Sequence, residues 1–144
     1  MGNIMNKILV QTILDRLNKC LNHNRYAVHQ REKNRRFIQR HTLSDKQIKN
    51  ILSKLTVDDY WKSEPSEVSA GSYVHLFFMQ VTLDSLAGET NTITLYVKFE
   101  LIELSCSEKS AALICADEID EDNIERTVVI SFHEAEWPAE YAFR

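Results

Sequence analysis

The residue pattern of this 144-residue chain changes near residue 70, from a helical spacing of apolar side chains to strand-like runs. Before that point apolar residues recur every three or four positions, which is typical of amphipathic helices. After it the chain is rich in β-branched and aromatic residues between turn residues, which is typical of strands. Helices followed by strands predict an α+β fold, in which N-terminal helices pack on one face of a twisted antiparallel β-sheet.

The first helix is predicted over residues 3–22, whose apolar side chains fall near one stripe at helical spacing. The stripe comprises Ile4, Ile8, Leu9, Ile13, Leu17 and Leu21. Apolar side chains gathered in a stripe need cover from water. We therefore expect this helix either to pack on the sheet or to join two copies of the chain as a homodimer.

Two more helices are predicted before residue 60. The range Tyr26–Gln39 has few apolar residues and a row of basic ones, and we interpret it as a second helix. Ser44 with Gln47 matches a capping box, in which each side chain accepts a hydrogen bond from the other residue's backbone, so a third helix is expected to follow. Thr56 repeats this signal three residues before Asp59 and predicts one further short turn.

Four strands are predicted, at Tyr73–Leu83, Ile93–Leu104, Ala111–Ala116 and Arg126–His133. Successive side chains of a strand point to opposite faces of its sheet. In the second of these strands every odd-numbered residue from 93 to 101 is apolar. Tyr96 and Lys98 therefore share the opposite face.

The last predicted strand supplies the other half of the same surface. Its even-numbered residues are assigned to the apolar face, namely Val128, Ile130 and Phe132. Its odd-numbered residues then face the other way, namely Val129, Ser131 and His133. If this strand pairs in matched register with the strand that carries Tyr96 and Lys98, one polar surface results. Such a surface is a natural place for a ligand.

The net charge of −4 hides a division between the two halves of the chain. Residues 1–62 carry 13 Lys and Arg against 5 Asp and Glu, a net +8, and the rest carry 4 against 16, a net −12. This asymmetry favours a polyanion partner for the basic half or a basic protein partner for the acidic half, unless the halves fold together and cancel. The length suits one domain. We divide 1–144 into an extra N-terminal helix (1–25), a basic helical part (26–66) and an acidic sheet part (70–144).

Cysteine usage and hydropathy restrict the class of protein further. The three cysteines are widely spaced and form no CxxC pair, which favours neither a disulfide framework nor a zinc site. No signal peptide is recognisable, and no run approaches the ~20 apolar residues of a membrane span. We expect a cytoplasmic protein with no membrane contact, no metal and no cofactor.

Four short strings, in this order, resemble the MqsR family of bacterial toxins, which belongs to the RelE-like ribonuclease superfamily. They are Arg31-Glu32-Lys33-Asn34, Asp59-Tyr60-Trp61-Lys62, Leu95-Tyr96-Val97-Lys98 and Ser131-Phe132-His133-Glu134-Ala135-Glu136-Trp137-Pro138. The resemblance covers roughly residues 28–140. It implies a RelE-like fold and a toxin endoribonuclease of a type II toxin-antitoxin system. It further implies mRNA as substrate, on or off the ribosome, and a cognate antitoxin protein as partner.

The resemblance also implies which side chains act. Lys62 matches a lysine of the family, Tyr96 matches a tyrosine, and His133 stands where some members have lysine. A glutamine of the family maps onto either Gln80 or His75. With Lys98 added, the expected catalytic set is Lys62, Tyr96, Lys98 and His133.

These residue types suit metal-free cleavage of RNA. A histidine suits proton transfer because its ordinary pKa is ~6.5, and the alternative is an edge-strand histidine bonded to backbone. Lysines would clamp the phosphate as negative charge develops. Tyr96 would either stack on a base or fill a gap in the packing. Nucleic-acid binding is expected of the basic helix through Arg31, Lys33, Arg35, Arg36 and Arg40.

Two departures from the family leave other interpretations open. Residues 1–25 have no counterpart in the short members, and residues 105–125 look longer and more acidic than the family's connection. The first alternative is a non-catalytic protein- or nucleic-acid-binding module on the same fold. A second alternative is a helix-turn-helix regulator built from residues 26–55.

Overall fold

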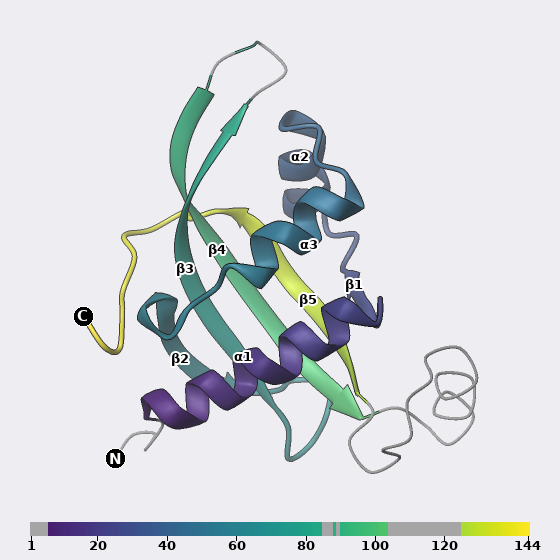
Figure 1. Cartoon of the computed structure of the whole chain (residues 1–144), viewed down its shortest axis with the longest axis vertical. Coiled ribbons are helices and arrows are strands. Elements are labelled where there is room, and N and C mark those ends of the chain that lie inside the picture. Colours follow the sequence, from purple (N-terminus) through teal and green to yellow (C-terminus); the bar gives the residue numbers. More distant parts are fainter. Residues whose placement is uncertain (1–5, 85–87, 89, 104–124) are drawn as a thin grey trace.

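A five-stranded sheet in the order β1-β5-β4-β3-β2 is the centre of the molecule in this computed structural model (Figure 1). The structure describes residues 6–84, 88, 90–103 and 125–144. In chain order the elements are α1 (Lys7–Asn22), β1 (Tyr26–Val28), α2 (Glu32–Arg40), α3 (Asp45–Ser53), the 3-10 turn η1 (Val57–Asp59), β2 (Tyr60–Pro65), β3 (Tyr73–Asp84), β4 (Thr90–Glu103) and β5 (Glu125–Glu134). The predicted α+β class is confirmed, but the sheet is mixed rather than wholly antiparallel, because β1 pairs in parallel with β5.

α1 packs on the sheet through one stripe. Its buried residues are Val10, Ile13, Leu14, Leu17, Cys20 and Leu21. The predicted stripe is wrong at its start, because Ile8 is 77% exposed and Leu9 is 48% exposed. At 100° per residue Ile8 lies on the far side of the helix from Ile13. The helix begins after Asn6, whose side chain accepts a hydrogen bond from the Leu9 backbone at 3.0 Å.

The second predicted helix is wrong over its first residues. Tyr26–Val28 forms β1, which pairs in parallel with β5. The His29 N–H donates to the Val129 carbonyl at 2.9 Å and continues this ladder. Tyr and Val suit a strand, and the free edge of β5 offers partners that a helix could not use. Helix α2 therefore begins only at Glu32.

The third helix and the short turn are confirmed. The Gln47 N–H donates to the Ser44 hydroxyl at 3.2 Å, and the Ser44 N–H donates to the Gln47 side chain at 2.8 Å, which is the predicted capping box. The turn after Thr56 is η1. The sequence interpretation missed β2, the edge strand that follows directly and that ends at Pro65, where a proline costs no ladder hydrogen bond.

A register shift in β5 changes which of its residues face the helices. Lys98 pairs with Ser131, but Phe99 pairs with Val129, so Ile130 is an extra residue. Val129 is therefore fully buried on the helix side, whereas Ile130 packs on the opposite face. The assignments of Val128 and Ile130 to the core and of Val129 to the other face were wrong. The predicted strand Ala111–Ala116 lies outside the described residues.

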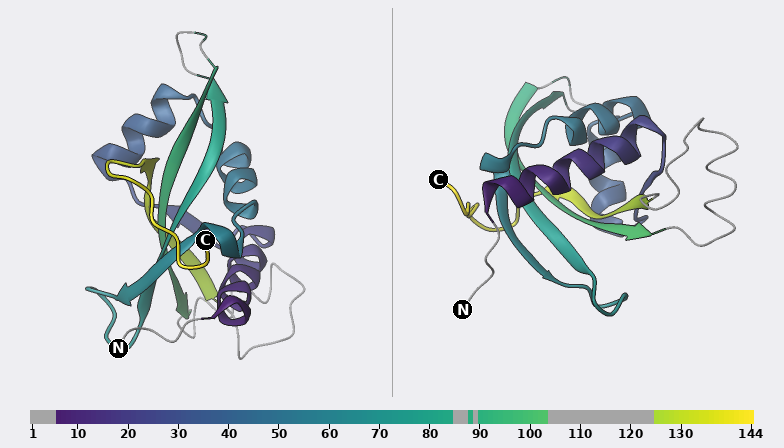
Figure 2. Two further views of the ribbon diagram at one scale, coloured as in Figure 1. Left: turned by 90° about the vertical axis from the view of Figure 1, so that its left-hand side faces the viewer. Right: turned by 60° about the horizontal axis from the view of Figure 1, so that its bottom comes forward.

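The two faces of the sheet are covered differently. α1 and α3 lie over one face and share its core with Phe77, Val97 and Phe99. We call the other side the open face; it carries a smaller apolar cluster of Val74, Leu76, Phe78 and Tyr96. Residues 135–144, the C-terminal tail, cross this open face, as Figure 2 shows. The tail is joined to β4 by the Ala135 N–H, which donates to the Thr94 carbonyl, and to β2 by the Ala142 N–H, which donates to the Tyr60 carbonyl; both contacts are 2.9 Å.

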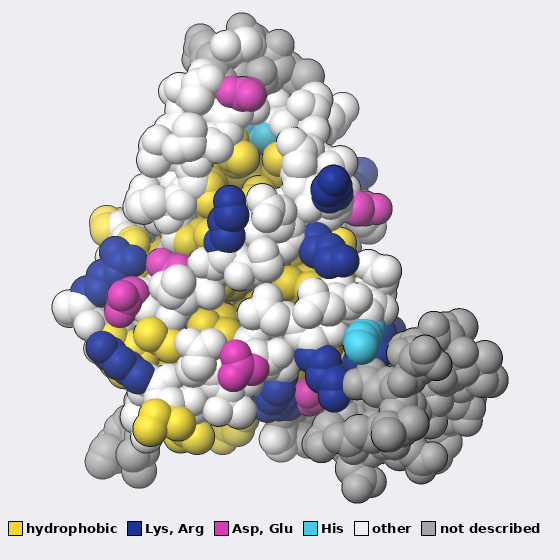
Figure 3. All heavy atoms as spheres, in the orientation of Figure 1, with side chains coloured by type: hydrophobic (Ala, Val, Ile, Leu, Met, Phe, Trp, Pro, Cys, Tyr) yellow, Lys and Arg dark blue, Asp and Glu magenta, His cyan; other side chains and the backbone are white. Residues whose placement is uncertain are grey.

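On the helix-bearing face the basic side chains of the described residues form no single patch. In Figure 3, Lys and Arg side chains are scattered among acidic, polar and apolar ones. None of the helices in the described part of the chain is long and apolar enough to cross a membrane.

Candidate functional site

A hollow of about 380 Å³, which we call the cleft, lies between the start of α2, the middle of β4, the end of β5 and the C-terminal tail. It opens on the open face of the sheet, at the β5 edge. The lining residues that matter most are Arg31, Lys33, Tyr96, Lys98, His133 and Trp137. It therefore collects three of the four predicted catalytic residues and two of the five predicted nucleic-acid-binding residues.

Strand pairing builds the floor of this cleft. Tyr96 pairs with His133, and Lys98 pairs with Ser131, so four side chains from strands far apart in the sequence lie on one face. The rings of Tyr96 and His133 are 5.7 Å apart between centroids and meet edge to face. This is the polar surface that strand alternation predicts. The register shift does not disturb this surface, because the extra residue Ile130 comes before Ser131 in the chain and the pairing from Ser131 to His133 is regular.

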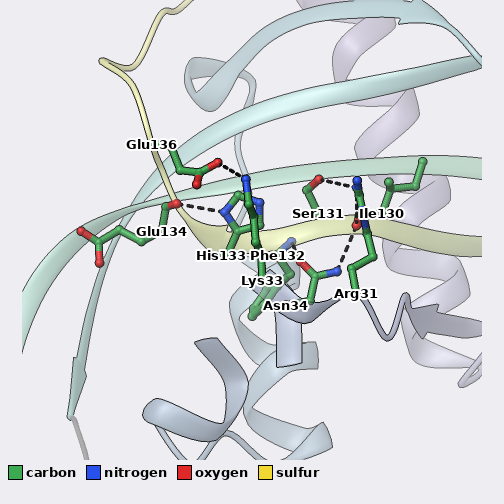
Figure 4. A network of polar contacts seen from close by, with 9 residues as sticks. All are labelled: Arg31, Lys33, Asn34, Ile130, Ser131, Phe132, His133, Glu134 and Glu136. Atoms are coloured by element: carbon green, nitrogen blue, oxygen red, sulfur yellow. Dashed lines mark hydrogen bonds and ion pairs between the residues drawn. The ribbon is translucent and has the colours of Figure 1, made fainter. Parts of the chain in front are cut away.

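Asn34 holds α2 against the edge of β5. Its side-chain oxygen accepts a hydrogen bond from the Phe132 N–H at 2.8 Å, and its amide nitrogen donates to the carbonyls of His29 and Ile130, each at 3.0 Å. The amide thereby continues the ladder of β5 just beyond the end of β1 (Figure 4). Asn34 is 1% exposed. This buried amide fixes the backbone beside His133.

The basic side chains of the wall have different partners. Lys33 donates to the Glu136 carboxylate at 2.6 Å, which neutralises both groups. Among the described residues Arg31 reaches two neutral oxygens, the Ile130 carbonyl at 3.4 Å and the Ser131 hydroxyl at 3.5 Å. Glu32, the other acid of the wall, is paired with Arg36. Within the described part of the chain neither Arg31 nor Lys98 forms an ion pair, so both positive charges can act on an anion in the cleft.

The tautomer of neutral His133 follows from its hydrogen bond. Its Nδ1 lies 2.9 Å from the Glu134 carbonyl (Figure 4). A carbonyl oxygen only accepts, so Nδ1 carries the proton and Nε2 keeps its lone pair. Nε2 is then the atom that takes a proton from a bound molecule. The alternative expectation, a histidine hydrogen-bonded to backbone, holds for Nδ1. It does not involve Nε2.

Tyr96 is buried under the cleft and only 6% exposed. Burial raises the pKa of its phenol to about 12, and the nearby Glu64 carboxylate adds to this rise. The phenol is therefore neutral near pH 7 and is suited to donating a hydrogen bond rather than to taking up a proton. Its ring packs between Phe78 and Trp137, at 5.3 and 5.2 Å, so it also fills the packing as the second interpretation of this residue expects.

Lys62 is not brought into the cleft. It lies on β2 and pairs with Leu76, which in turn pairs with Lys98. Two strand spacings put the backbones of Lys62 and Lys98 roughly 10 Å apart on the same face. The Lys62 ammonium binds the Glu64 carboxylate at 3.1 Å and lies over the Trp61 ring at 4.3 Å. It is an outlying cation on the open face.

The remaining arginines of α2 face different sides. Arg36 and Arg40 line a neighbouring hollow of about 340 Å³, which also includes Lys33 and His133. Arg35 lines a separate hollow near β1. The row of basic residues is therefore split, with Arg36 and Arg40 beside the cleft and Arg35 away from it.

The two candidates for the family's glutamine lie on opposite faces. Gln80 is on the open face and donates to the Thr94 hydroxyl at 2.7 Å. His75 lies under the helices, where its Nδ1 is 2.7 Å from the Ser63 hydroxyl. Burial lowers the pKa of His75 to about 4. Neither residue lines the cleft.

Much of the acidic charge lies outside the described residues. Of the 17 Lys and Arg the structure describes 16, and of the 21 Asp and Glu it describes 14, so the described part carries +2 against −4 for the whole chain. Within that part no group of three or more His, Cys, Asp or Glu is placed to hold a metal ion.

Comparisons with known proteins give no relative: no family model, no curated protein and no solved structure matches this chain.

Two residues of the cleft were missed as functional candidates. Asn34 stood in a resemblance string, but the sequence of a basic helix does not show that one of its asparagine side chains will hydrogen-bond the backbone of β5. Trp137 also stood in a resemblance string but was assigned no functional role, because sequence does not show where a tail crosses a sheet.

Proposed function

We propose that the cleft binds the phosphodiester backbone of single-stranded RNA and cuts it without a metal, as a toxin endoribonuclease does. The observation that carries the proposal is that the pairing of β4 with β5 puts His133 and Lys98 on one face of the sheet, where both line the cleft together with Arg31. One proton-transfer group and two available cations beside one hollow suit a phosphodiester better than a neutral ligand.

His133 has the role of general base in this proposal. Its Nε2 takes the proton from the ribose 2′-hydroxyl, and the 2′-oxygen attacks the adjacent phosphorus. The P–O5′ bond breaks, which leaves a 2′,3′-cyclic phosphate on one product and a 5′-hydroxyl on the other. The leaving 5′-oxygen takes its proton from the Lys98 ammonium or from water, so the atoms and charges balance.

Lys98 and Arg31 stabilise the charge that develops on the phosphoryl oxygens. Fixed positive charges accelerate the reaction when their attraction to the phosphoryl oxygens is stronger in the transition state than in the bound substrate. Tyr96 adds one donated hydrogen bond, because its phenol stays protonated near neutral pH. Lys62 would contact a neighbouring phosphate, since it lies on the same face but outside the hollow.

The resemblance to the MqsR toxins supports this proposal and extends it. It suggests a RelE-like fold, an mRNA substrate, a cytoplasmic setting and a cognate antitoxin that binds the chain and silences it. The described residues carry a net charge of +2, which is compatible with an anionic ligand.

Expression in bacteria tests the proposal. The intact chain should arrest growth and fragment mRNA. The variants His133→Gln and Lys98→Met should each grow normally and keep their mRNA intact. Lys46→Met is the matched control, because Lys46 is an exposed lysine on α3, away from the cleft. Growth arrest that persists in His133→Gln at equal protein level would refute the role of His133.

The alternative is a module that binds single-stranded nucleic acid without cutting it. The position of Lys62 favours it, because one of the four expected catalytic residues lies outside the cleft. This alternative predicts tight binding of RNA that stays intact, and no growth arrest.

A further inference from the structure

Trp137 stands out among the exposed apolar side chains because of where it lies. It is 42% exposed, and it lines the cleft together with Lys98 and His133. Single exposed apolar residues are ordinary on protein surfaces. An indole beside two cations and a proton-transfer group is a different case, because these groups attract a charged ligand that also has an aromatic part.

The indole is held in place from behind. The Tyr96 ring packs against it at 5.2 Å between centroids, at an angle of 60°. Tyr96 is itself buried and packs on Phe78 at 5.3 Å. This row of rings supports Trp137 on its inner side, and 42% of the residue stays exposed to solvent.

The tail that carries Trp137 is anchored on both sides of it. Ahead of the tryptophan, the Ala135 N–H donates to the Thr94 carbonyl at 2.9 Å. Behind it, the Arg144 guanidinium binds Asp59 at 3.1 Å and lies over the Tyr141 ring at 3.8 Å. Pro138 restricts the backbone directly after Trp137. The platform is therefore ordered before any ligand arrives, which lowers the entropic cost of stacking.

We propose that Trp137 is a stacking platform for a nucleobase of single-stranded nucleic acid, next to the phosphate held by Lys98 and Arg31. This inference rests on the proposed function in one respect, that the cleft holds a phosphodiester. Base stacking on an aromatic side chain tolerates every base, because each base has a π-face. The platform thus selects an unpaired base over a duplex, in which the faces are covered.

A binding experiment tests the platform without any cleavage. The probes are a short oligothymidylate, which has no 2′-hydroxyl and so is not cut, and an abasic deoxyribose-phosphate oligomer of equal length and charge. In a Trp61→Phe background Trp137 is the one tryptophan left of the two in the chain. Its fluorescence should be quenched by the oligothymidylate and not by the abasic oligomer.

Affinity measured by fluorescence anisotropy of labelled probes gives the second readout. Trp137→Ala should weaken oligothymidylate binding roughly 5- to 150-fold, the usual worth of one stacked base, and leave abasic binding unchanged. Trp137→Phe should restore most of the affinity, which separates stacking from loss of folding. Equal binding of oligothymidylate by Trp137→Ala and the parent protein would overturn the inference, and so would equal quenching by the abasic oligomer.

The outcomes separate this inference from the proposed function. Trp137-dependent binding of the base-bearing probe, with RNA left intact by the same preparation, would keep the platform and remove the cleavage. RNA cutting with no effect of Trp137→Ala on either probe or on KM would keep the cleavage and remove the platform.

Discussion

The amide of Asn34 is the most informative stability test, because one small side chain joins three segments. Asn34→Ala leaves the buried N–H of Phe132 without its partner, and it removes the two bonds donated to His29 and Ile130. A stranded buried group costs about 1–3 kcal/mol, and each other lost bond about 0.5–1.5 kcal/mol at most. The Ile130 carbonyl recovers part of its loss, since it also accepts from Arg31.

One opposing effect lowers the expected loss. Asn34 is inside α2, and alanine is the better helix former by up to about 0.7 kcal/mol. The net loss in free energy of unfolding should be about 1.5–3.5 kcal/mol, a large share of the ~5–15 kcal/mol of an ordinary domain. Urea unfolding followed by circular dichroism measures it.

Two further variants sharpen the result. Gln39→Ala is the matched control on the same helix, since Gln39 is exposed, and it should change stability by less than about 0.5 kcal/mol. Asn34→Asp keeps the oxygen that serves Phe132 but points a carboxylate at two carbonyls. It should be unstable near neutral pH and recover on acidification, when the protonated carboxyl donates again. A loss below about 0.5 kcal/mol in Asn34→Ala would refute the ladder role.

Three more predictions concern titration and the ranking of the lysines. His75 has a folded pKa of about 4 against an ordinary 6.5, so its contribution to the free energy of unfolding is complete above pH ~6.5 and falls by up to about 3 kcal/mol as the pH drops toward 4. Urea unfolding measured between these pH values should show a weaker dependence on pH in His75→Gln than in the parent protein. An equally steep fall in that variant would contradict the assignment. In alkaline titration by phenolate absorbance, Tyr96→Phe should remove an ionisation step near pH 12. Lys98→Met should weaken oligonucleotide binding more than Lys62→Met, because Lys62 is paired with Glu64 outside the cleft; the reverse order in anisotropy titrations would move the site to β2.

The polar floor of the cleft was predictable because it follows from local rules. Alternation along β4 fixes the common face of Tyr96 and Lys98, and it needs no knowledge of the partner strand. The pairing with Ser131 and His133 then follows from matching polar faces. The capping box at Ser44 is equally local and was equally readable.

The failures share a cause in long-range contacts. β1 is a strand because the edge of β5 is free beside it, and nothing within residues 26–28 announces that edge. The extra residue Ile130 lies where Phe99 and Val129 pack together in the helix-side core. This contact joins two strands and cannot be inferred from the sequence of β5 alone. Lys62 looked equivalent to Lys98 because sequence order does not show that Leu76 lies between them.

The most direct test of the central claim is cleavage of a labelled single-stranded RNA by the purified chain in the presence of EDTA. The account predicts products that end in a 2′,3′-cyclic phosphate, and a rate that falls by roughly 10²–10⁴-fold in His133→Gln, the usual share of a general base. RNA that stays intact with the parent protein would contradict the account, and so would cutting at the same rate by His133→Gln.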